Sequence, residues 1–162
     1  MKPPPAGAAR ALLVDVVREA RDWAPPAREI RTWASAALGR RAAGAELAVR
    51  VVKPAESKRL NARFRGRDKA TNVLSFPVPQ LPGALGRAPR PLGDLVICAS
   101  VVREEARQQH KAIKAHWAHL VVHGALHLLG YDHEQDAEAR RMERREVTVL
   151  KRFGIPNPYR SV

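Results

Sequence analysis

Three histidines in the second half of the chain have the side-chain type and the spacing of metal ligands. His123 and His127 lie four residues apart in a stretch with helical apolar spacing, so both imidazoles project from one helix face, one turn apart. Gly130 follows, and glycine readily adopts the left-handed conformation that ends a helix and turns the chain back. We therefore expect this turn to bring His133 beside the other two imidazoles as a third ligand.

The spacing of these histidines matches the elongated zinc motif of metzincin peptidases, H-E-x-x-H-x-x-G-x-x-H, apart from one residue. Position 124 is Gly, where those peptidases carry the Glu that acts as general base. Three neutral imidazoles leave the fourth position of a zinc ion open, which is typical of catalytic sites. The sequence thus predicts a three-histidine zinc site that is not a peptidase, although imidazole sites also bind other divalent metals.

Two further residues near this motif are candidates for supporting roles. His119 lies one turn before His123 and either contacts substrate, supports a ligand, or is a hydrogen-bonded histidine in the wall of the cleft. Asp132 precedes the third ligand and can orient an imidazole or help to deprotonate a bound water, although a carboxylate in a turn need do neither. A three-histidine site lowers the pKa of bound water to about 7, so the missing Glu does not exclude hydrolysis.

A basic loop in the first half of the chain offers the positive charge that cleavage of a phosphodiester needs. It contains Arg63, Arg65, Arg67 and Lys69. The planar guanidinium of arginine is well suited to pairing with phosphoryl oxygens. The whole chain has a net charge of +13, from 29 basic and 16 acidic residues. This charge suits a polyanionic partner such as nucleic acid, although base-composition bias in an Ala- and Pro-rich chain also produces many arginines.

The hydrophobic pattern predicts the elements that must position these residues. Runs of β-branched or alternating apolar residues predict strands at residues 11–17, 46–52, 71–77 and 93–100. Apolar residues at helical spacing predict several helices, including one over about residues 113–129 that carries His123 and His127. Residues 77–92 are rich in proline, which predicts a long loop beside the site.

The length and composition of the chain favour one soluble domain. A chain of 162 residues is long enough to bury roughly two thirds of its unfolded surface. We expect a single domain over residues 11–160, preceded by a disordered tail at 1–10. The chain shows neither the apolar core of a signal peptide nor a run long enough to span a membrane, and its single cysteine, Cys98, fits a reducing compartment. We therefore expect a cytoplasmic protein, with a short organellar transit segment as the alternative.

Four segments of the chain together closely resemble the bacterial YbeY family. They are FRGRDKATNVLSFP at 64–77, GDLVIC at 93–98, HWAHLVVHGALHLLGYDH at 116–133, and a C-terminal helix that begins with acidic residues. These motifs are long and specific, and the resemblance extends over most of the chain from about residue 45. Ala70 departs from the pattern, because the family usually has Pro there, and the Pro-rich insert looks peculiar to this chain.

The resemblance implies a metal-dependent, single-strand endoribonuclease that acts in maturation of ribosomal RNA, especially at the 3′ end of the small-subunit RNA, and in ribosome quality control. It implies a small α+β domain related to the zincin peptidases, with a mixed sheet of about four strands packed by about five helices. The metal-binding histidines of the family match His123, His127 and His133, and its functionally important arginine matches Arg65. The implied cofactor is zinc, and the implied partners are RNA and the small ribosomal subunit.

Two other functions stay open at this point. One is an RNA-binding ribosome assembly factor with a structural metal and little nuclease activity, which a fourth protein ligand such as His119 would favour. The other is a metallohydrolase that acts on a small substrate, against which the basic loop weighs modestly. For a nuclease, either a metal-bound water or the 2′-hydroxyl of the RNA is compatible as the nucleophile.

Overall fold

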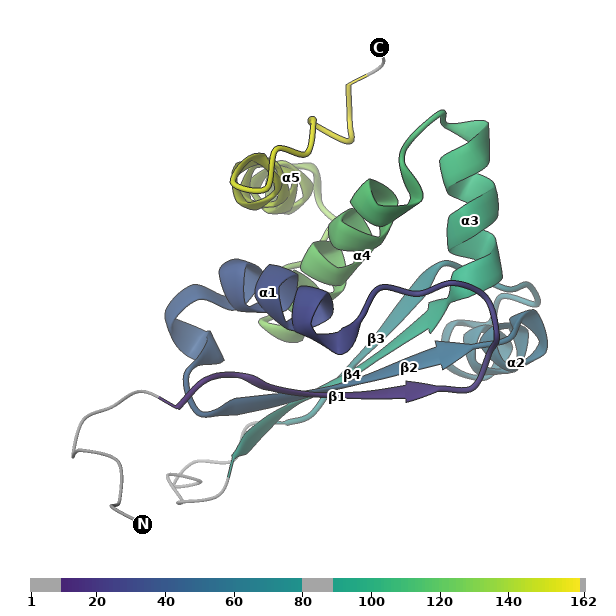
Figure 1. Cartoon of the computed structure of the whole chain (residues 1–162), viewed down its shortest axis with the longest axis horizontal. Helices are drawn as coiled ribbons and strands as arrows, with labels where there is room; N and C mark the ends of the chain where they lie inside the picture. The colour runs from purple at the N-terminus through teal and green to yellow at the C-terminus, as the bar shows by residue number, and fades with distance from the viewer. Residues whose placement is uncertain (1–9, 80–88, 161–162) are drawn as a thin grey trace.

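The computed structural model describes residues 10–79 and 89–160, and in it a four-stranded sheet forms the base of the molecule (Figure 1). The strands follow the order β1-β2-β4-β3 across the sheet. Their bounds are β1 (Leu13–Arg18), β2 (Ala45–Val52), β3 (Val73–Pro77) and β4 (Arg90–Cys98). Strands β1, β2 and β4 are parallel, and β3 pairs antiparallel with β4 at one edge. The expected tail at 1–10 lies outside the described residues except for its last position.

Five α-helices pack around this sheet in the described part of the chain. They are α1 (Ala27–Leu38), α2 (Pro54–Arg65), α3 (Ala99–Gln108), α4 (Ile113–Leu128) and α5 (Asp136–Lys151). A short 3-10 helix, η1 (Gly39–Ala42), follows α1. Figure 1 shows α1 and α4 over the same face of the sheet, with α5 stacked beyond them. The expected α+β architecture, with a mixed four-stranded sheet and five helices, is confirmed.

Strand β4 is covered on both faces, as its continuous apolar run predicts. Leu95 and Ile97 are fully buried in the large core that also contains residues of α1 and α4. Val96 and Cys98 alternate with them and belong to a smaller buried cluster with Leu60 of α2. The sheet thus carries α4 on one face and α2 on the other.

Strand β4 begins earlier than the sequence predicts. Arg90 and Pro91 pair with β2, although they fall within the range expected for the Pro-rich loop. Pro91 is compatible with a strand here because the ladder between β3 and β4 reaches only to Gly93. The loop prediction at 77–92 is therefore wrong for residues 90–92, and residues 80–88 of that range lie outside the described residues. Pro77 is the last residue of the edge strand β3, as predicted.

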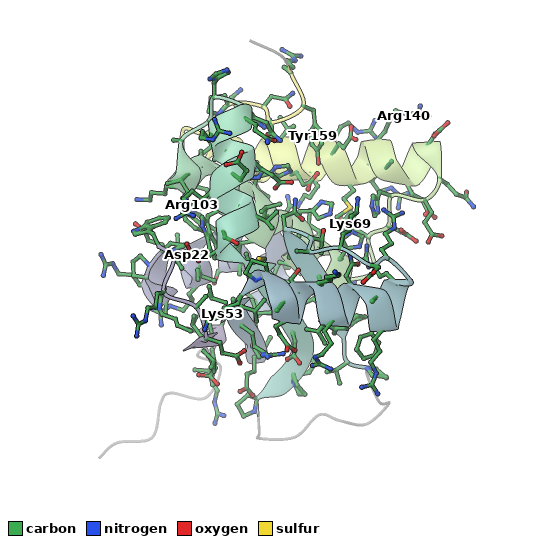
Figure 2. The ribbon with its side chains drawn as sticks, turned by 90° about the vertical axis from the view of Figure 1, so that its right-hand side faces the viewer. Asp22, Lys53, Lys69, Arg103, Arg140 and Tyr159 are labelled. Carbon is green, nitrogen blue, oxygen red and sulfur yellow. The ribbon has the colours of Figure 1, made fainter. Side chains whose placement is uncertain are left out.

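Helix α3 is fixed to its surroundings by two charged residues. Glu105 accepts a hydrogen bond from Nδ2 of Asn72 at 3.0 Å, and its Oε1 lies 2.9 Å from Nε2 of His116 on α4. Arg103 forms an ion pair of 3.0 Å with Asp22, in the segment between β1 and α1 (Figure 2). The contact with His116 joins α3 to the N-terminal half of α4, and the ion pair joins α3 to the segment between β1 and α1.

Helix α1 follows the amphipathic pattern of its sequence. Its buried residues are Ile30, Trp33, Ala34, Ala37 and Leu38. They pack in the same core as Trp117 and Leu126 of α4. Among the described residues, no helix combines the length and the apolar character needed to cross a membrane.

Candidate metal centre

Helix α4 ends in a glycine turn of the kind that its sequence predicts. Gly130 has a φ of +99°. Its N–H donates to the carbonyl of His127 at 2.9 Å, and the N–H of Tyr131 donates to the carbonyl of Leu126 at 3.1 Å. This pair of hydrogen bonds is a Schellman motif, which satisfies carbonyls at the helix end. The chain therefore reverses directly after α4 and returns residues 131–133 toward the helix.

The turn brings the three predicted metal ligands together. The ring centroids are 4.7 Å apart for His123 and His127, 5.0 Å for His127 and His133, and 5.7 Å for His123 and His133. An ion bound tetrahedrally at about 2 Å from each ring nitrogen places imidazole centroids about 5 Å apart. The observed separations of the three rings are close to this spacing.

A fully buried carboxylate supports the first of these histidines. Oε1 of Glu146 on α5 lies 2.6 Å from Nδ1 of His123, and the Glu146 side chain is 0% exposed. An ionised carboxylate only accepts hydrogen bonds, so Nδ1 of His123 donates and its Nε2 keeps a lone pair. Metal-binding histidines are commonly oriented in this way. The contact therefore leaves Nε2 as the ring nitrogen of His123 with a lone pair.

Glu146 also holds His119 and Tyr159. Its Oε2 accepts a hydrogen bond from the hydroxyl of Tyr159, and its Oε1 lies 3.4 Å from Nε2 of His119. Burial by itself raises the pKa of Glu146, but hydrogen bonds from His119 and His123 outweigh it and lower this pKa to about 2. The carboxylate is therefore ionised at neutral pH. Figure 2 shows Tyr159 close to α5, in the segment that follows this helix.

The position of His119 bears on the alternative of a fourth protein ligand. Nε2 of His119 lies 3.2 Å from the hydroxyl of Tyr159, in addition to its approach to Glu146. Potential ligand atoms of His119, His123 and Glu146 do lie within 4.8 Å of one another. Those three side chains, however, are already joined through the Glu146 carboxylate. We therefore regard them as support for His123 and not as a second metal site.

Sequence reasoning missed Glu146, although a signal for it exists. The buried residues of α5 are Met142, Glu146, Val149 and Leu150, which share one face of the helix. An acidic residue on the apolar face of an amphipathic helix must have buried partners, because an unpaired buried charge is strongly unfavourable. The sequence does not show which partners these are, since His123 lies 23 residues away.

The other two histidines of the cluster lie beside Asp132. Potential ligand atoms of His127, Asp132 and His133 are within 4.8 Å of one another. Oδ1 of Asp132 accepts the backbone N–H of His133 at 2.7 Å, and this bond lowers the pKa of Asp132. Burial, with the nearby charges of His123 and His133, lowers the pKa of His127 to about 4. The imidazole of His127 is therefore neutral at physiological pH, as a metal ligand must be.

Two residues of the predicted basic loop line the same pocket as His127 and His133. The pocket has a volume of about 510 Å³ and is lined by Arg65, Arg67, His127, Gly130, Tyr131, Asp132, His133 and Glu134. Arg65 is the last residue of α2, so a helix on the opposite face of the sheet supplies it. Arg63 differs, because its guanidinium lies 5.3 Å from the centre of the Phe64 ring. The structure thus brings Arg65 and Arg67 to the histidine cluster.

Comparison with known proteins identifies the family. The family profile described as Endoribonuclease YbeY matches residues 18–154. The chain belongs to the YbeY family. It is 51% identical over 138 residues to a protein named Endoribonuclease YbeY from Halorhodospira halophila (strain DSM 244 / SL1), covering 85% of this chain and 90% of that protein. The solution structure of TM1509 from Thermotoga maritima covers 86% of this chain and 87% of its own, with a TM-score of 0.60 and 24% identity, and shows the likeness of fold.

This YbeY-family chain differs from the peptidases at Gly124 for a reason of packing. A Cβ atom at this position would lie 2.7 Å from Cδ2 of Leu95 and 3.3 Å from Oγ of Ser75. Helix α4 therefore approaches β3 and β4 too closely for a side chain. A glutamate at position 124 would be directed into the core between α4 and the sheet. The position is unsuited to a general base and serves the close contact between α4 and the sheet.

Proposed function

We propose that this protein is a metal-dependent endoribonuclease that cleaves single-stranded RNA during processing of ribosomal RNA. Membership of a family described as Endoribonuclease YbeY supports the reaction. The observation that carries the proposal is the convergence of three imidazoles, two of which, those of His127 and His133, line a pocket together with Arg65. The specific substrate is the 3′ end of the small-subunit RNA, acted on in the cytoplasm with the small ribosomal subunit as partner, and the activity also serves ribosome quality control.

His123, His127 and His133 would hold the metal, and zinc suits a site made of imidazoles. When bound, zinc acts as a Lewis acid that polarises a phosphoryl oxygen and lowers the pKa of water. Glu146 fixes the Nδ1–H form of His123, so that Nε2 keeps the lone pair that a metal ligand needs. Burial keeps His127 neutral. Both features prepare the ligands before an ion arrives, which reduces the cost of assembling the site.

Arg65 would bind the scissile phosphate in this mechanism. Its guanidinium carries a permanent charge and lines the pocket of His127 and His133. Charge develops on the phosphoryl oxygens during cleavage, and a donor held in place beforehand stabilises it without reorganisation. Arg67 lines the same pocket and adds positive charge to it. Asp132 is ionised and holds the turn before His133 through the backbone.

Metal content and cleavage, measured together, test the proposal. Wild-type protein and His127→Ala are loaded with zinc, passed over a desalting column and examined by elemental analysis. Both are then incubated with an unstructured RNA and with an RNA that contains the small-subunit 3′ end. We expect one zinc per wild-type chain and cleavage of both RNAs, with each property lost in His127→Ala. Wild-type protein that retains zinc and binds RNA without cleaving it would contradict the proposal and favour an assembly factor.

A further inference from the structure

A second pocket adjoins the metal centre on the far side of the turn after α4. Its volume is about 600 Å³, and it lies between the end of α1 with η1 and the part of α5 that contains Glu138, Arg141 and Arg145. Three residues of the turn, Gly130, Tyr131 and Asp132, line both this pocket and the pocket of the metal centre. The two hollows are therefore adjacent, with the turn as their common wall.

The second pocket is lined by four arginines from two separate elements. Arg40 and Arg41 come from η1, and Arg141 and Arg145 come from α5. We call this hollow the arginine groove. Three of these side chains are exposed and Arg145 is half-buried. Within residues 10–79 and 89–160, none of the ion pairs engages these four guanidinium groups.

The concentration of like charge in the arginine groove is unfavourable without an anion. Arg141 and Arg145 are four residues apart on α5, a spacing at which like charges repel. Glu138 and Asp132 also line the groove, but Asp132 accepts the backbone N–H of His133. The arginines therefore outnumber the carboxylates, and their guanidinium groups retain donors for a ligand. Phosphate is the anion that a guanidinium binds in bidentate fashion and that recurs along a nucleic-acid strand.

We infer that the arginine groove binds the phosphates of an RNA strand as it leaves the metal centre. This inference rests on the proposed function, because the strand must first occupy the pocket of Arg65. A strand longer than the pocket of Arg65 must extend beyond this pocket. The arginine groove shares a wall with the pocket and is therefore a place to which the strand can extend. Successive phosphates along the strand would then meet Arg65 on one side of the turn and Arg141 and Arg145 on the other. The groove would add affinity that does not depend on base sequence.

Helix α5 supplies a matched control for this inference. Arg140 and Arg144 have the same spacing on the same helix as Arg141 and Arg145. Both are exposed, and neither lines the arginine groove or the pocket of the metal centre. Figure 2 places Arg140 at one end of α5. Replacing either pair by alanine removes the same charge from the same helix, so only the position of the charge differs.

The test measures RNA affinity as a function of salt for the zinc-loaded full chain. The probes are fluorescent 2′-O-methyl oligouridylates of about 4 and about 16 nucleotides, which span the usual range of single-strand site sizes. Gel analysis after each titration checks that the probes remain intact. The proteins are the wild type, Arg141→Ala/Arg145→Ala, Arg40→Ala/Arg41→Ala, and the control Arg140→Ala/Arg144→Ala. Arg40→Ala/Arg41→Ala tests the opposite wall of the groove, so the test does not rely on changes in α5 alone.

For the longer probe, each groove double variant should bind about tenfold more weakly than wild type at physiological salt. Its slope of log affinity against log salt should be smaller by about 1.4, since each phosphate contact on a single strand contributes about 0.7. The control should match wild type, and the short probe should bind all four proteins equally. Groove variants that match the control, whether both lose affinity or both keep it, would overturn the inference.

Cleavage of a short RNA by wild type, measured in parallel, separates this inference from the proposed function. If wild type cleaves the RNA but the groove and control variants bind it equally well, the arginine groove does not bind RNA. The nuclease assignment then still holds. Wild type that does not cleave would contradict the proposed function, whereas weaker binding confined to the groove variants would still identify the groove as an RNA-binding surface.

Discussion

Glu146 connects the metal centre to the C-terminal segment of the chain through a single carboxylate. It contacts His123, His119 and Tyr159, and it is fully buried. A buried charge of this kind is tolerated only when its partners are present, and its removal leaves those partners unsatisfied. We therefore regard Glu146 as the residue that orients His123, acting through that ligand and without contact to the RNA.

We expect Glu146→Gln to weaken zinc binding by about 10–100-fold, because partners of metal-binding histidines typically contribute this much. An amide keeps the volume of the side chain but loses the charge, and its NH2 group can face Nδ1 of His123. Competition with a coloured chelator measures the affinity. Glu143→Gln, an exposed change on the same helix, is the control and should bind zinc as wild type does. Equal affinities in the two variants would contradict the role of Glu146.

Arg65 is distinguished from its neighbour Arg63 by position. Arg65→Ala should slow single-turnover cleavage by about 100–1000-fold while zinc content stays unchanged, because a donor to transition-state charge is lost. Arg65→Lys should recover part of the rate, since an ammonium keeps the charge without the bidentate fork. Arg63→Ala should change the rate little, because Arg63 lies over the ring of Phe64. Similar losses in Arg65→Ala and Arg63→Ala would show that Arg65 is one phosphate contact among several.

The chain ends of the cleaved RNA report which nucleophile Arg65 assists. A 2′,3′-cyclic phosphate indicates attack by the 2′-hydroxyl of the RNA, whereas its absence at early times indicates attack by water. The pocket contains the permanent cation that either route needs. Neither outcome alters the expected contrast between Arg65 and Arg63.

Among the elements, α4 is the one on which the site depends most directly. It carries two of the three histidines and packs against β3, β4, α1, α3 and α5. Its close approach to the sheet is set at Gly124, where Leu95 and Ser75 occupy the space of a side chain. Leu95 is fully buried, so its side chain has no free volume into which it can move. The position of the imidazoles over the sheet therefore depends on the absence of a side chain at Gly124.

Gly124→Ala should destabilise the protein by about 1 kcal/mol. Overpacking a core costs about 1–3 kcal/mol, and the higher helix propensity of alanine offsets up to about 1 kcal/mol of this. In a Leu95→Val background, which removes the δ-carbons, the same change should cost less. Urea unfolding of the two single variants and the double variant measures this coupling. Additive effects would show that the contact with Leu95 does not determine the cost.

Glu105 gives a prediction about how α3 and α4 are joined. Burial raises its pKa, but hydrogen bonds from His116 and Asn72 outweigh burial, so the folded pKa lies below the ordinary value of 4.5. A carboxyl with a lowered pKa contributes stability above its unfolded pKa and loses it as the pH falls through the folded pKa. Glu105→Gln should therefore reduce the free energy of unfolding by about 1–2 kcal/mol at neutral pH.

Urea unfolding at several pH values measures the effect of Glu105→Gln. The difference from wild type should be largest above pH 4.5 and should shrink as the pH falls below it. Glu104→Gln is the control, because Glu104 pairs with the exposed Arg107 of its own helix. A difference for Glu105→Gln that persists unchanged into acid would mean that its ionised carboxylate does not link the helices.

For the whole molecule, the sequence predicts the parts of the site that are local and misses those that depend on packing. The spacing of His123, His127 and His133 places the imidazoles together because a helix and a single turn relate them. Glu146 and the Arg141 side of the arginine groove depend on how α5 lies against α4 and α1, which no local pattern encodes. The role of Arg65 likewise follows from the family resemblance and not from a local pattern. Helix α2, which carries Arg65, packs on the face of the sheet opposite to α4, so local spacing does not relate Arg65 to the histidines.

The contrast between local pattern and tertiary packing also explains which helices and strands the sequence predicts correctly. The helical spacing of apolar residues predicts a helix over about residues 113–129, and α4 spans Ile113–Leu128. The prolines of residues 77–92 predict a loop because proline is unfavourable in strands, and pairing with β2 overrides that local preference at residues 90 and 91. Phe64 is 57% exposed although it lies four residues after the buried Leu60, because its ring packs edge-on against Phe76 at the rim of the smaller core.

Zinc should stabilise the whole fold, because its ligands join α4 to the turn that follows it. Occupancy at about 100 times the dissociation constant adds about 2.7 kcal/mol, which corresponds to a rise in Tm of about 5–10 °C for a chain of this size. The His133 side chain is 53% exposed, and its nearest charged partner is Asp132 at 3.6 Å, so His133→Ala should leave the metal-free Tm almost unchanged. It should, however, abolish most of the rise with zinc. Scanning calorimetry with and without chelator measures both values. The control is His110→Ala, because His110 is exposed and lies outside both pockets, and this variant should retain the full wild-type rise in Tm. A rise in His133→Ala equal to that of wild type would show that the ion binds elsewhere.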